Sequence, residues 1–189
     1  PQNTIIEGVL LHFGKQKQVF LKPGKMLHIS RLSLLFSFIL IIQSCTTKSE
    51  WELVWADEFD YSGSPATESW GYEIGHIRNN ELQYYTDQLQ NVRVEDGLCL
   101  ITARQEGEDS ITSASMNTLG KHDFLYGKLE VRAQIPSALG TWPAIWMLGT
   151  NISDLGWPAC GEIDIMEHVG YDPDQIHANI HTRAYNHTI

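Results

Sequence analysis

Short runs that favour β-strands recur along residues 51–189, and several of them alternate apolar with polar residues. Alternation with a period of two places successive side chains on opposite faces of a half-buried strand. The predicted strands are 51–55, 91–95, 98–104, 111–118, 126–135, 162–167 and 176–182. Asp96 and Gly97, between two of these runs, predict a tight hairpin. No helix longer than one turn is predicted in residues 51–189, so the pattern favours an all-β sandwich.

The first 45 residues follow a different pattern. Basic residues precede a mostly apolar run at 32–42, in which Ser33 and Ser37 are the two polar residues. A run of this length is too short to cross a bilayer as a helix but is typical of a signal peptide, with a buried core helix as the alternative. The run ends just before Cys45, in a context that resembles a bacterial lipobox, where Cys45 would carry a lipid. A plain secretory cleavage nearby is the other reading.

These features divide the chain into four parts. We expect residues 1–25 to be an upstream extension without a fold of its own and 26–45 to be a signal peptide. Residues 46–50 form a short polar tether, and 51–189 form the folded domain. The protein is therefore expected to be secreted or anchored to the cell envelope, and to meet a membrane only through its N-terminal lipid.

The charge of the chain narrows the choice of partner. The formal net charge is −10 at pH 7, and 22 of the 23 acidic residues lie beyond residue 45. No basic patch appears, which argues against nucleic acid and, more weakly, against polyanionic substrates. Cys99 and Cys160 could pair outside the cytoplasm or remain buried thiols, since each lies beside apolar residues.

Three carboxylates lie within the run 162–167. In a regular strand Glu162 and Asp164 share a face, while Glu167 points to the opposite one. Two apolar residues in succession, Ile165 and Met166, stand where strict alternation would have one. A β-bulge at this point would turn Glu167 towards the other two acids.

Converging carboxylates suit the cleavage of a glycosidic bond. A retaining glycosidase needs one carboxylate to attack and another to donate a proton, about 5–5.5 Å apart. The negative charge of Asp164 between the glutamates would favour keeping one acid protonated. A calcium loop or a solvated acidic strand are the alternatives, but a calcium loop usually carries Gly and Asn rather than Ile and Met.

Aromatic and polar residues elsewhere suit a sugar ligand. Trp142 and Trp146 are four residues apart and share a face if the chain is extended, with burial in the core as the alternative. The amides of Asn79, Asn80 and Gln83 suit sugar hydroxyls, or else belong to a solvated loop. His177 and His181 share one face of the last predicted strand, where a zinc pair or a hydrogen-bonded histidine are the two readings.

The run 162–167 resembles the Glu-x-Asp-x-x-Glu signature of family 16 glycoside hydrolases, in the bulged form of the laminarinase-like branch. Further segments resemble that branch in the expected order: 55–60, 80–86, 126–132 and 140–149. The resemblance covers residues 51–189. It implies a β-jelly-roll sandwich of the concanavalin A-like type with a concave cleft.

The resemblance also implies an activity and residue roles. The activity is retaining endo-hydrolysis of β-1,3-glucan (laminarin-like) or of mixed-linkage β-1,3-1,4-glucan. Glu162 would be the nucleophile, Glu167 the general acid/base, and Asp164 would hydrogen-bond the nucleophile. The residues implied in substrate binding are Trp142, Trp146, Asn80, Arg78 and His181, the last beside the acids. No cofactor is implied for catalysis, although many relatives carry a structural calcium, here in the region of Glu58.

Two departures from the family pattern stand out. The family's domain normally continues for several strands beyond the position of Ile189, so we expect a jelly roll that is incomplete at its C-terminus and inactive by itself. Ser115 stands where many relatives have Arg. Three other activities compete with glucan hydrolysis: non-catalytic β-glucan binding, hydrolysis of an algal galactan, and a metal-dependent reaction that uses His177, His181 and the acids.

Overall fold

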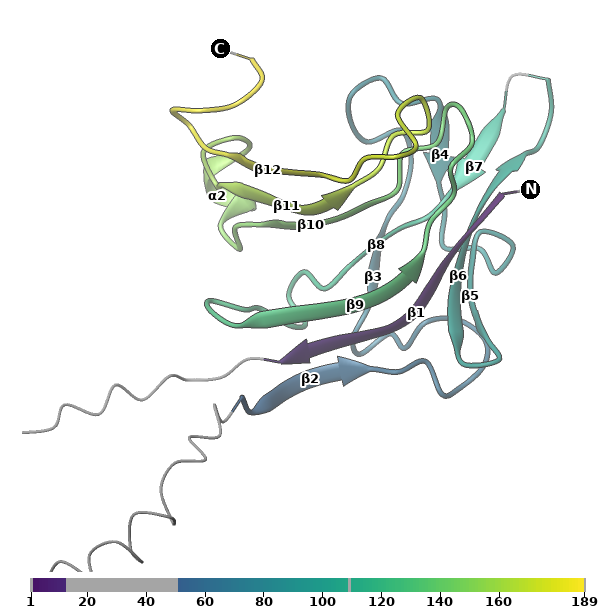
Figure 1. Ribbon diagram of the computed structural model, residues 1–189, viewed down its shortest axis with the longest axis horizontal. Coiled ribbons are helices and arrows are strands. Elements are labelled where there is room, and N and C mark those ends of the chain that lie inside the picture. Colours follow the sequence, from purple (N-terminus) through teal and green to yellow (C-terminus); the bar gives the residue numbers. More distant parts are fainter. Residues whose placement is uncertain (1, 13–50, 109, 189) are drawn as a thin grey trace, which may run out of the picture.

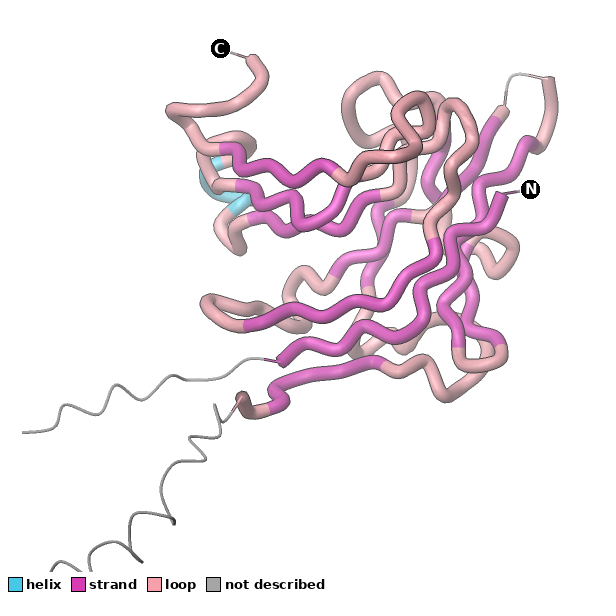
Figure 2. Tube along the Cα trace, in the orientation of Figure 1, coloured by secondary structure: helices cyan, strands magenta, loops and turns pink. Residues whose placement is uncertain are grey.

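The computed structural model describes residues 2–12, 51–108 and 110–188, and nearly all of their regular structure is strand (Figure 1). The strands are β1 (Gln2–His12), β2 (Leu53–Asp57), β3 (Gly71–Glu73), β4 (Gln83–Tyr85), β5 (Val92–Glu95), β6 (Leu98–Gln105), β7 (Ile111–Ser113), β8 (Ser115–Asn117), β9 (Lys128–Gln134), β10 (Ala144–Leu148), β11 (Glu162–Glu167) and β12 (His177–His181). Within this described part the one helix is α2 (Ile152–Leu155), a single turn (Figure 2). The all-β prediction is confirmed.

Seven strands form the largest sheet. Its main path runs β2-β1-β6-β7-β4, with β5 paired to β6 and β9 paired to β1. The predicted hairpin is confirmed as β5 and β6, joined through Asp96 and Gly97. Both turn residues have positive φ, 53° and 77°, as a two-residue turn that continues the twist of its strands requires.

Strand β1 is the main difference from the sequence-based division of the chain. Residues 1–25 were expected to lack a fold, but Gln2–His12 pair with β2, β6 and β9. The segment is rich in β-branched residues, which favour an extended backbone. Its apolar residues come as one run of two and one run of three rather than in alternation, so the period-two pattern did not mark it.

A separate three-stranded antiparallel sheet has the order β10-β11-β12. In Figure 1 it forms a layer across from β9, β1 and β2. A two-stranded ladder of β3 and β8 completes the regular structure of the described residues. The predicted strand at 111–118 is therefore two short strands, β7 and β8, in different ladders.

The core lies against the large sheet. Its buried members are Phe59, Val92, Val94, Cys99 and Ala114, and partly buried aromatic rings pack around them. Cys99 and Cys160 are both free thiols, and burial, followed by the nearby charge of Asp57, raises the pKa of Cys99 to about 12. A buried thiol of this kind is unreactive.

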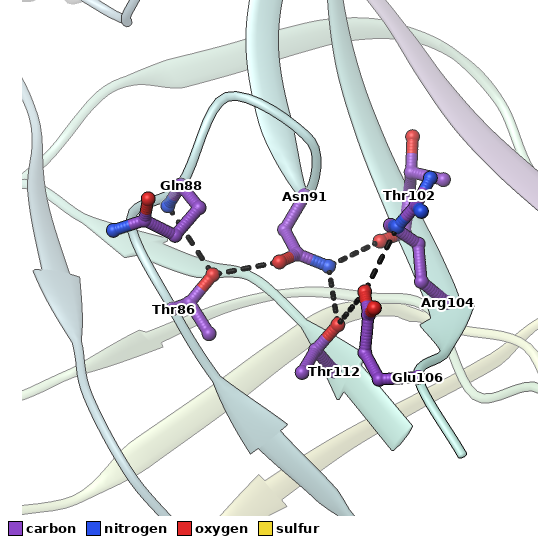
Figure 3. Close-up of polar contacts among 7 residues, drawn as sticks. All are labelled: Thr86, Gln88, Asn91, Thr102, Arg104, Glu106 and Thr112. Carbon is purple, nitrogen blue, oxygen red and sulfur yellow. Dashed lines mark hydrogen bonds and ion pairs between the residues drawn. The ribbon is translucent and has the colours of Figure 1, made fainter. Parts of the chain in front are cut away.

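One buried amide ties two strands to the segment that follows β4 (Figure 3). Asn91 is 0% exposed; its Nδ2 donates to the Thr102 carbonyl at 3.0 Å and to Thr112 Oγ1 at 2.9 Å. Its Oδ1 accepts a hydrogen bond from Thr86 Oγ1 at 2.7 Å. The network joins the segment after β4 to β6 and β7, and leaves no hydrogen-bonding group of the amide unused.

Several sequence-based predictions lie outside the described residues. They are the signal peptide at 26–45, the lipidated Cys45 and the tether at 46–50, and all three stay predictions, as does the location in the cell envelope. In the described ranges no helix combines the length and the apolar character that crossing a membrane requires.

Candidate active site

The strand that carries the three acids contains the expected bulge. On the β10 side, Trp146 pairs with Asp164 and Ile145 with Met166, which leaves Ile165 without a partner. On the β12 side, the register also shifts between Asp164 and Glu167. The β-bulge predicted near Ile165 is therefore confirmed.

The bulge brings all three carboxylates to one side of the sheet. Residues that pair directly across an antiparallel ladder share a face. The partners on β12 are His181 for Glu162, Asn179 for Asp164, and His177 for Glu167. On β10 they are Leu148, Trp146 and Ala144, in the same order. We call this side of the β10-β11-β12 sheet, with these nine residues, the acid face.

Glu162 is held by an indole from the turn that precedes its strand. Trp157 Nε1 donates a hydrogen bond to Glu162 Oε2. The Trp157 ring also packs against His187, with centroids 5.0 Å apart, and against His181 at 6.0 Å. This aromatic group surrounds one end of the acid row, so the Glu162 carboxylate is both oriented and partly shielded from water.

Glu167 is held by two donors from different elements. Trp142 Nε1 donates to Oε1 at 3.0 Å, and Asn179 Nδ2 donates to Oε2 at 2.9 Å. Trp142 precedes β10, whereas Asn179 lies within β12. With one donor on each oxygen, rotation of the carboxylate is restricted.

Asp164 is the most buried of the three acids, at 5% exposed. Its burial, the negative charges of Glu162 and Glu167, and a hydrogen bond to Glu162 raise the pKa of Asp164 to about 6. His181 works in the opposite direction, and its Nε2 lies 3.2 Å from Asp164 Oδ2. The centre of the acid row therefore holds a proton well above the pH at which an exposed Asp would lose it.

The predicted substrate residues are only partly brought together. Trp142 is 67% exposed and touches Glu167, and His181 touches Asp164, so both lie at the acids. Trp146 pairs with Asp164 and packs against the Arg78 guanidinium. Asn80 is exposed in a turn with a φ of 54°.

Arg78 is engaged within the protein. Burial disfavours its charged form, but the hydrogen bond and the charge of Glu73 outweigh this and raise the pKa of Arg78. Ser115, the residue that departs from the family pattern, donates a hydrogen bond of 2.6 Å to the same Glu73. The guanidinium thus has a fixed counterion rather than a free one.

The two histidines of β12 do not form a metal site together. His181 approaches Asp164, whereas His177 Nε2 lies 3.8 Å from Asp172 in the preceding turn. Across residues 2–12, 51–108 and 110–188, no three His, Cys, Asp or Glu side chains are arranged to hold a metal ion. A structural calcium near Glu58 stays a prediction.

Sequence reasoning missed two residues that touch the glutamates, Trp157 and Asn179. Asn179 was visible in principle, because it alternates with His177 and His181 and so shares their face. Trp157 lies in an irregular turn five residues before Glu162. No periodicity relates a turn residue to a strand, so only the tertiary structure reveals its contact.

The β10-β11-β12 sheet carries three acids on one face, held by indole and amide donors, and comparison with known proteins names the family. Residues 77–188 match the sequence pattern of the family described as Glycosyl hydrolases family 16, and the chain belongs to this family. It is 51% identical over 146 residues to a beta-glucanase of Rhodothermus marinus, covering 74% of this chain and 51% of that protein. It is 40% identical over 160 residues to a glucan endo-1,3-beta-glucosidase of Cryptopygus antarcticus. This match covers 79% of this chain and 58% of that protein.

A solved structure supports the fold. The laminarinase from Rhodothermus marinus superimposes with a TM-score of 0.69 at 50% sequence identity, over 73% of this chain and 58% of that one. The family resemblance and the jelly-roll architecture inferred from the sequence are thereby confirmed. The chain spans between half and three fifths of the length of these relatives.

Proposed function

We propose that this chain carries the catalytic acids of a retaining endo-hydrolase of β-1,3-glucan or mixed-linkage β-1,3-1,4-glucan. The observation that carries the proposal is the pairing of two glutamates on one face, each fixed by an indole N–H, around a buried Asp164. The names of the similar proteins support the substrate class, since they are glucanases.

Glu162 is assigned as the nucleophile. Its carboxylate attacks the anomeric carbon and forms a glycosyl–enzyme bond, while the glycosidic bond to the leaving sugar breaks. Trp157 orients one oxygen of this carboxylate. Asp164, when protonated, shares its hydrogen bond with Glu162 and adds no second negative charge beside it.

Glu167 is assigned as the general acid/base. As the acid it gives its proton to the departing glycosidic oxygen. As the carboxylate it then takes a proton from the water that releases the sugar from Glu162. In that second state it accepts hydrogen bonds from Trp142 and Asn179, which stabilise the negative charge.

Hydrolysis by the full-length protein tests the proposal. Laminarin, mixed-linkage β-glucan and an algal galactan are compared by the release of reducing ends and by product size. Proton NMR of the first product identifies its anomer, and retention is expected. Glu162→Gln should reduce the rate to background, and Glu167→Gln should reduce it by about 10²–10⁴-fold. Glu95→Gln, on the exposed end of β5, is the matched control.

The alternatives give different results. Glucan binding without turnover by the full-length wild-type protein would replace hydrolysis with a binding function. Turnover of the galactan alone would change the substrate class. Activity that a chelator abolishes and zinc restores would favour the metal-dependent reading, whereas the assigned mechanism predicts no change with a chelator.

A further inference from the structure

The side chain of Arg78 lies between two aromatic rings. Its guanidinium carbon is 5.1 Å from the centre of the Trp146 ring and 5.6 Å from that of Tyr85. The side chain is only 24% exposed. A cation over an aromatic face at this distance attracts the ring, and more strongly when water is excluded. Arg78 therefore braces the indole of Trp146 against β4.

The charge of Arg78 is anchored from a third ladder. Glu73, at the end of β3, forms an ion pair with Arg78. Ser115 pairs directly with Glu73 across the β3–β8 ladder and donates a hydrogen bond to it. Because Glu73 and Ser115 lie on paired strands, the position of the carboxylate, and through it of the guanidinium, is set by the backbone.

The other side of the contact is on the acid face. Trp146 pairs with Asp164 in the β10–β11 ladder, and its side chain is half-buried. A shift of its indole would therefore change the surface directly beside the catalytic acids. Arg78 does not need a sugar as its partner, because the Glu73 carboxylate already balances its charge.

We propose that Arg78, Glu73 and Ser115 form a brace that positions Trp146 and thereby sets the affinity of the acid face for glucan. The part concerning affinity rests on the function proposed above. Arg78 is then a positioning residue and acts through the indole, in contrast to the direct contact with sugar hydroxyls that the family resemblance implied. The three acids keep their own hydrogen bonds without it, so the chemical step is not its target.

Steady-state kinetics on laminarin separate the two effects. Arg78→Gln and Glu73→Gln should each raise KM by about 3- to 30-fold, with kcat within twofold of wild type. Arg78→Lys keeps the charge but loses the planar stack, so it should recover only part of the affinity. Ser115→Ala should have a smaller effect in the same direction.

Matched controls come from β5. Arg93 and Glu95 form an exposed ion pair of the same residue types at 2.8 Å. Arg93→Gln and Glu95→Gln should leave both KM and kcat unchanged. Circular dichroism and the urea midpoint of each variant identify any loss of folding.

A readout that does not depend on activity tests the brace itself. The indole N–H resonance of Trp146, assigned by its loss in Trp146→Phe, should shift in Arg78→Gln and Glu73→Gln but not in Arg93→Gln. If the wild type hydrolyses glucan and these variants keep its KM, or lose kcat alone, the inference is overturned. If the wild type neither binds nor hydrolyses glucan, the proposed function fails, and an unmoved Trp146 resonance would then overturn the brace separately.

Discussion

The indole nitrogen of Trp142 donates a hydrogen bond of 3.0 Å to a carboxylate oxygen of Glu167. The same ring is 67% exposed, beside the residues of the acid face. One side chain thus offers a flat apolar surface and fixes the acid that would protonate the leaving group. A sugar ring that bound against Trp142 would therefore be coupled to the orientation of Glu167 through this contact.

Trp142→Phe should separate these two roles. Phenylalanine keeps an aromatic surface but removes the N–H, and a hydrogen bond to a charged group contributes about 1.5 kcal/mol. We expect kcat on laminarin to fall about tenfold with little change in KM, whereas Trp142→Ala should impair both. Trp51→Phe, at an exposed indole that precedes β2, is the control. A Trp142→Phe enzyme with wild-type kcat would show that the hydrogen bond has no catalytic role.

Asn179 provides the second donor to Glu167, at 2.9 Å. Asn179→Ala should lower kcat about tenfold, since one carboxylate oxygen loses its partner. Asn179→Asp should lower it further, because a second carboxylate then faces Glu167 without a donated proton. Gln175→Ala removes an exposed amide from the turn before β12 and serves as the control. Equal activity of Asn179→Ala and Asn179→Asp would contradict the expected repulsion between the new carboxylate and Glu167.

The raised pKa of Asp164 makes the stability of the fold depend on pH. The folded-state pKa is about 6 against an ordinary value of 3.8. Protonated Asp164 therefore stabilises the fold fully below pH 3.8, and this contribution is lost as the pH rises through 6. Asparagine does not titrate, so the Asp164→Asn variant does not lose this stability as the pH rises. Relative to wild type, its free energy of unfolding should improve by up to about 3 kcal/mol between pH 4 and pH 8.

Urea unfolding at pH 4, 6 and 8 measures the effect. Asp174→Asn removes one exposed negative charge from the neighbouring turn and controls for net charge. A difference between Asp164→Asn and wild type that stays constant over this range would show that Asp164 is not the titrating group.

Much of the site follows from the sequence because strand parity is a local property. The Ile165–Met166 step breaks a period of two, and only an extra residue in the ladder restores Glu167 to the side of Asp164. The shared side of Glu162 and Asp164 follows from the same rule and needs no knowledge of distant contacts. The place of His181 beside them was implied by the family resemblance, because parity does not say which strand pairs with β11.

The rest depends on contacts that periodicity does not encode. Trp157 donates its hydrogen bond to Glu162 from an irregular turn. Arg78 forms an ion pair with Glu73 within the protein itself. The strand at Gln2–His12 was missed for a related reason. Its place between β6 and β9 is set by pairing with residues far away in sequence, such as Cys99 and Gln134, and its apolar runs carry no period of two.

The buried network around Asn91 gives the sharpest test of the fold. Asn91→Ala removes three hydrogen bonds and leaves the Thr102 carbonyl and two hydroxyls in the interior with fewer partners. Each unsatisfied buried group costs about 1–3 kcal/mol, so we expect a loss of roughly 3–5 kcal/mol in the free energy of unfolding. Gln90→Ala, one residue earlier and exposed, should change it by less than about 0.5 kcal/mol.

Asn91→Asp distinguishes hydrogen bonding from packing. Aspartate has nearly the same shape as asparagine, but it cannot donate to Thr102 and Thr112, and its charge would be buried. We therefore expect it to destabilise the protein at pH 7 at least as much as Asn91→Ala, and less at pH 4, where it is protonated and can donate one hydrogen bond. Denaturant midpoints at the two pH values measure this. If Asn91→Asp were as stable as wild type at pH 7, the network would not hold β6 and β7 to the segment after β4.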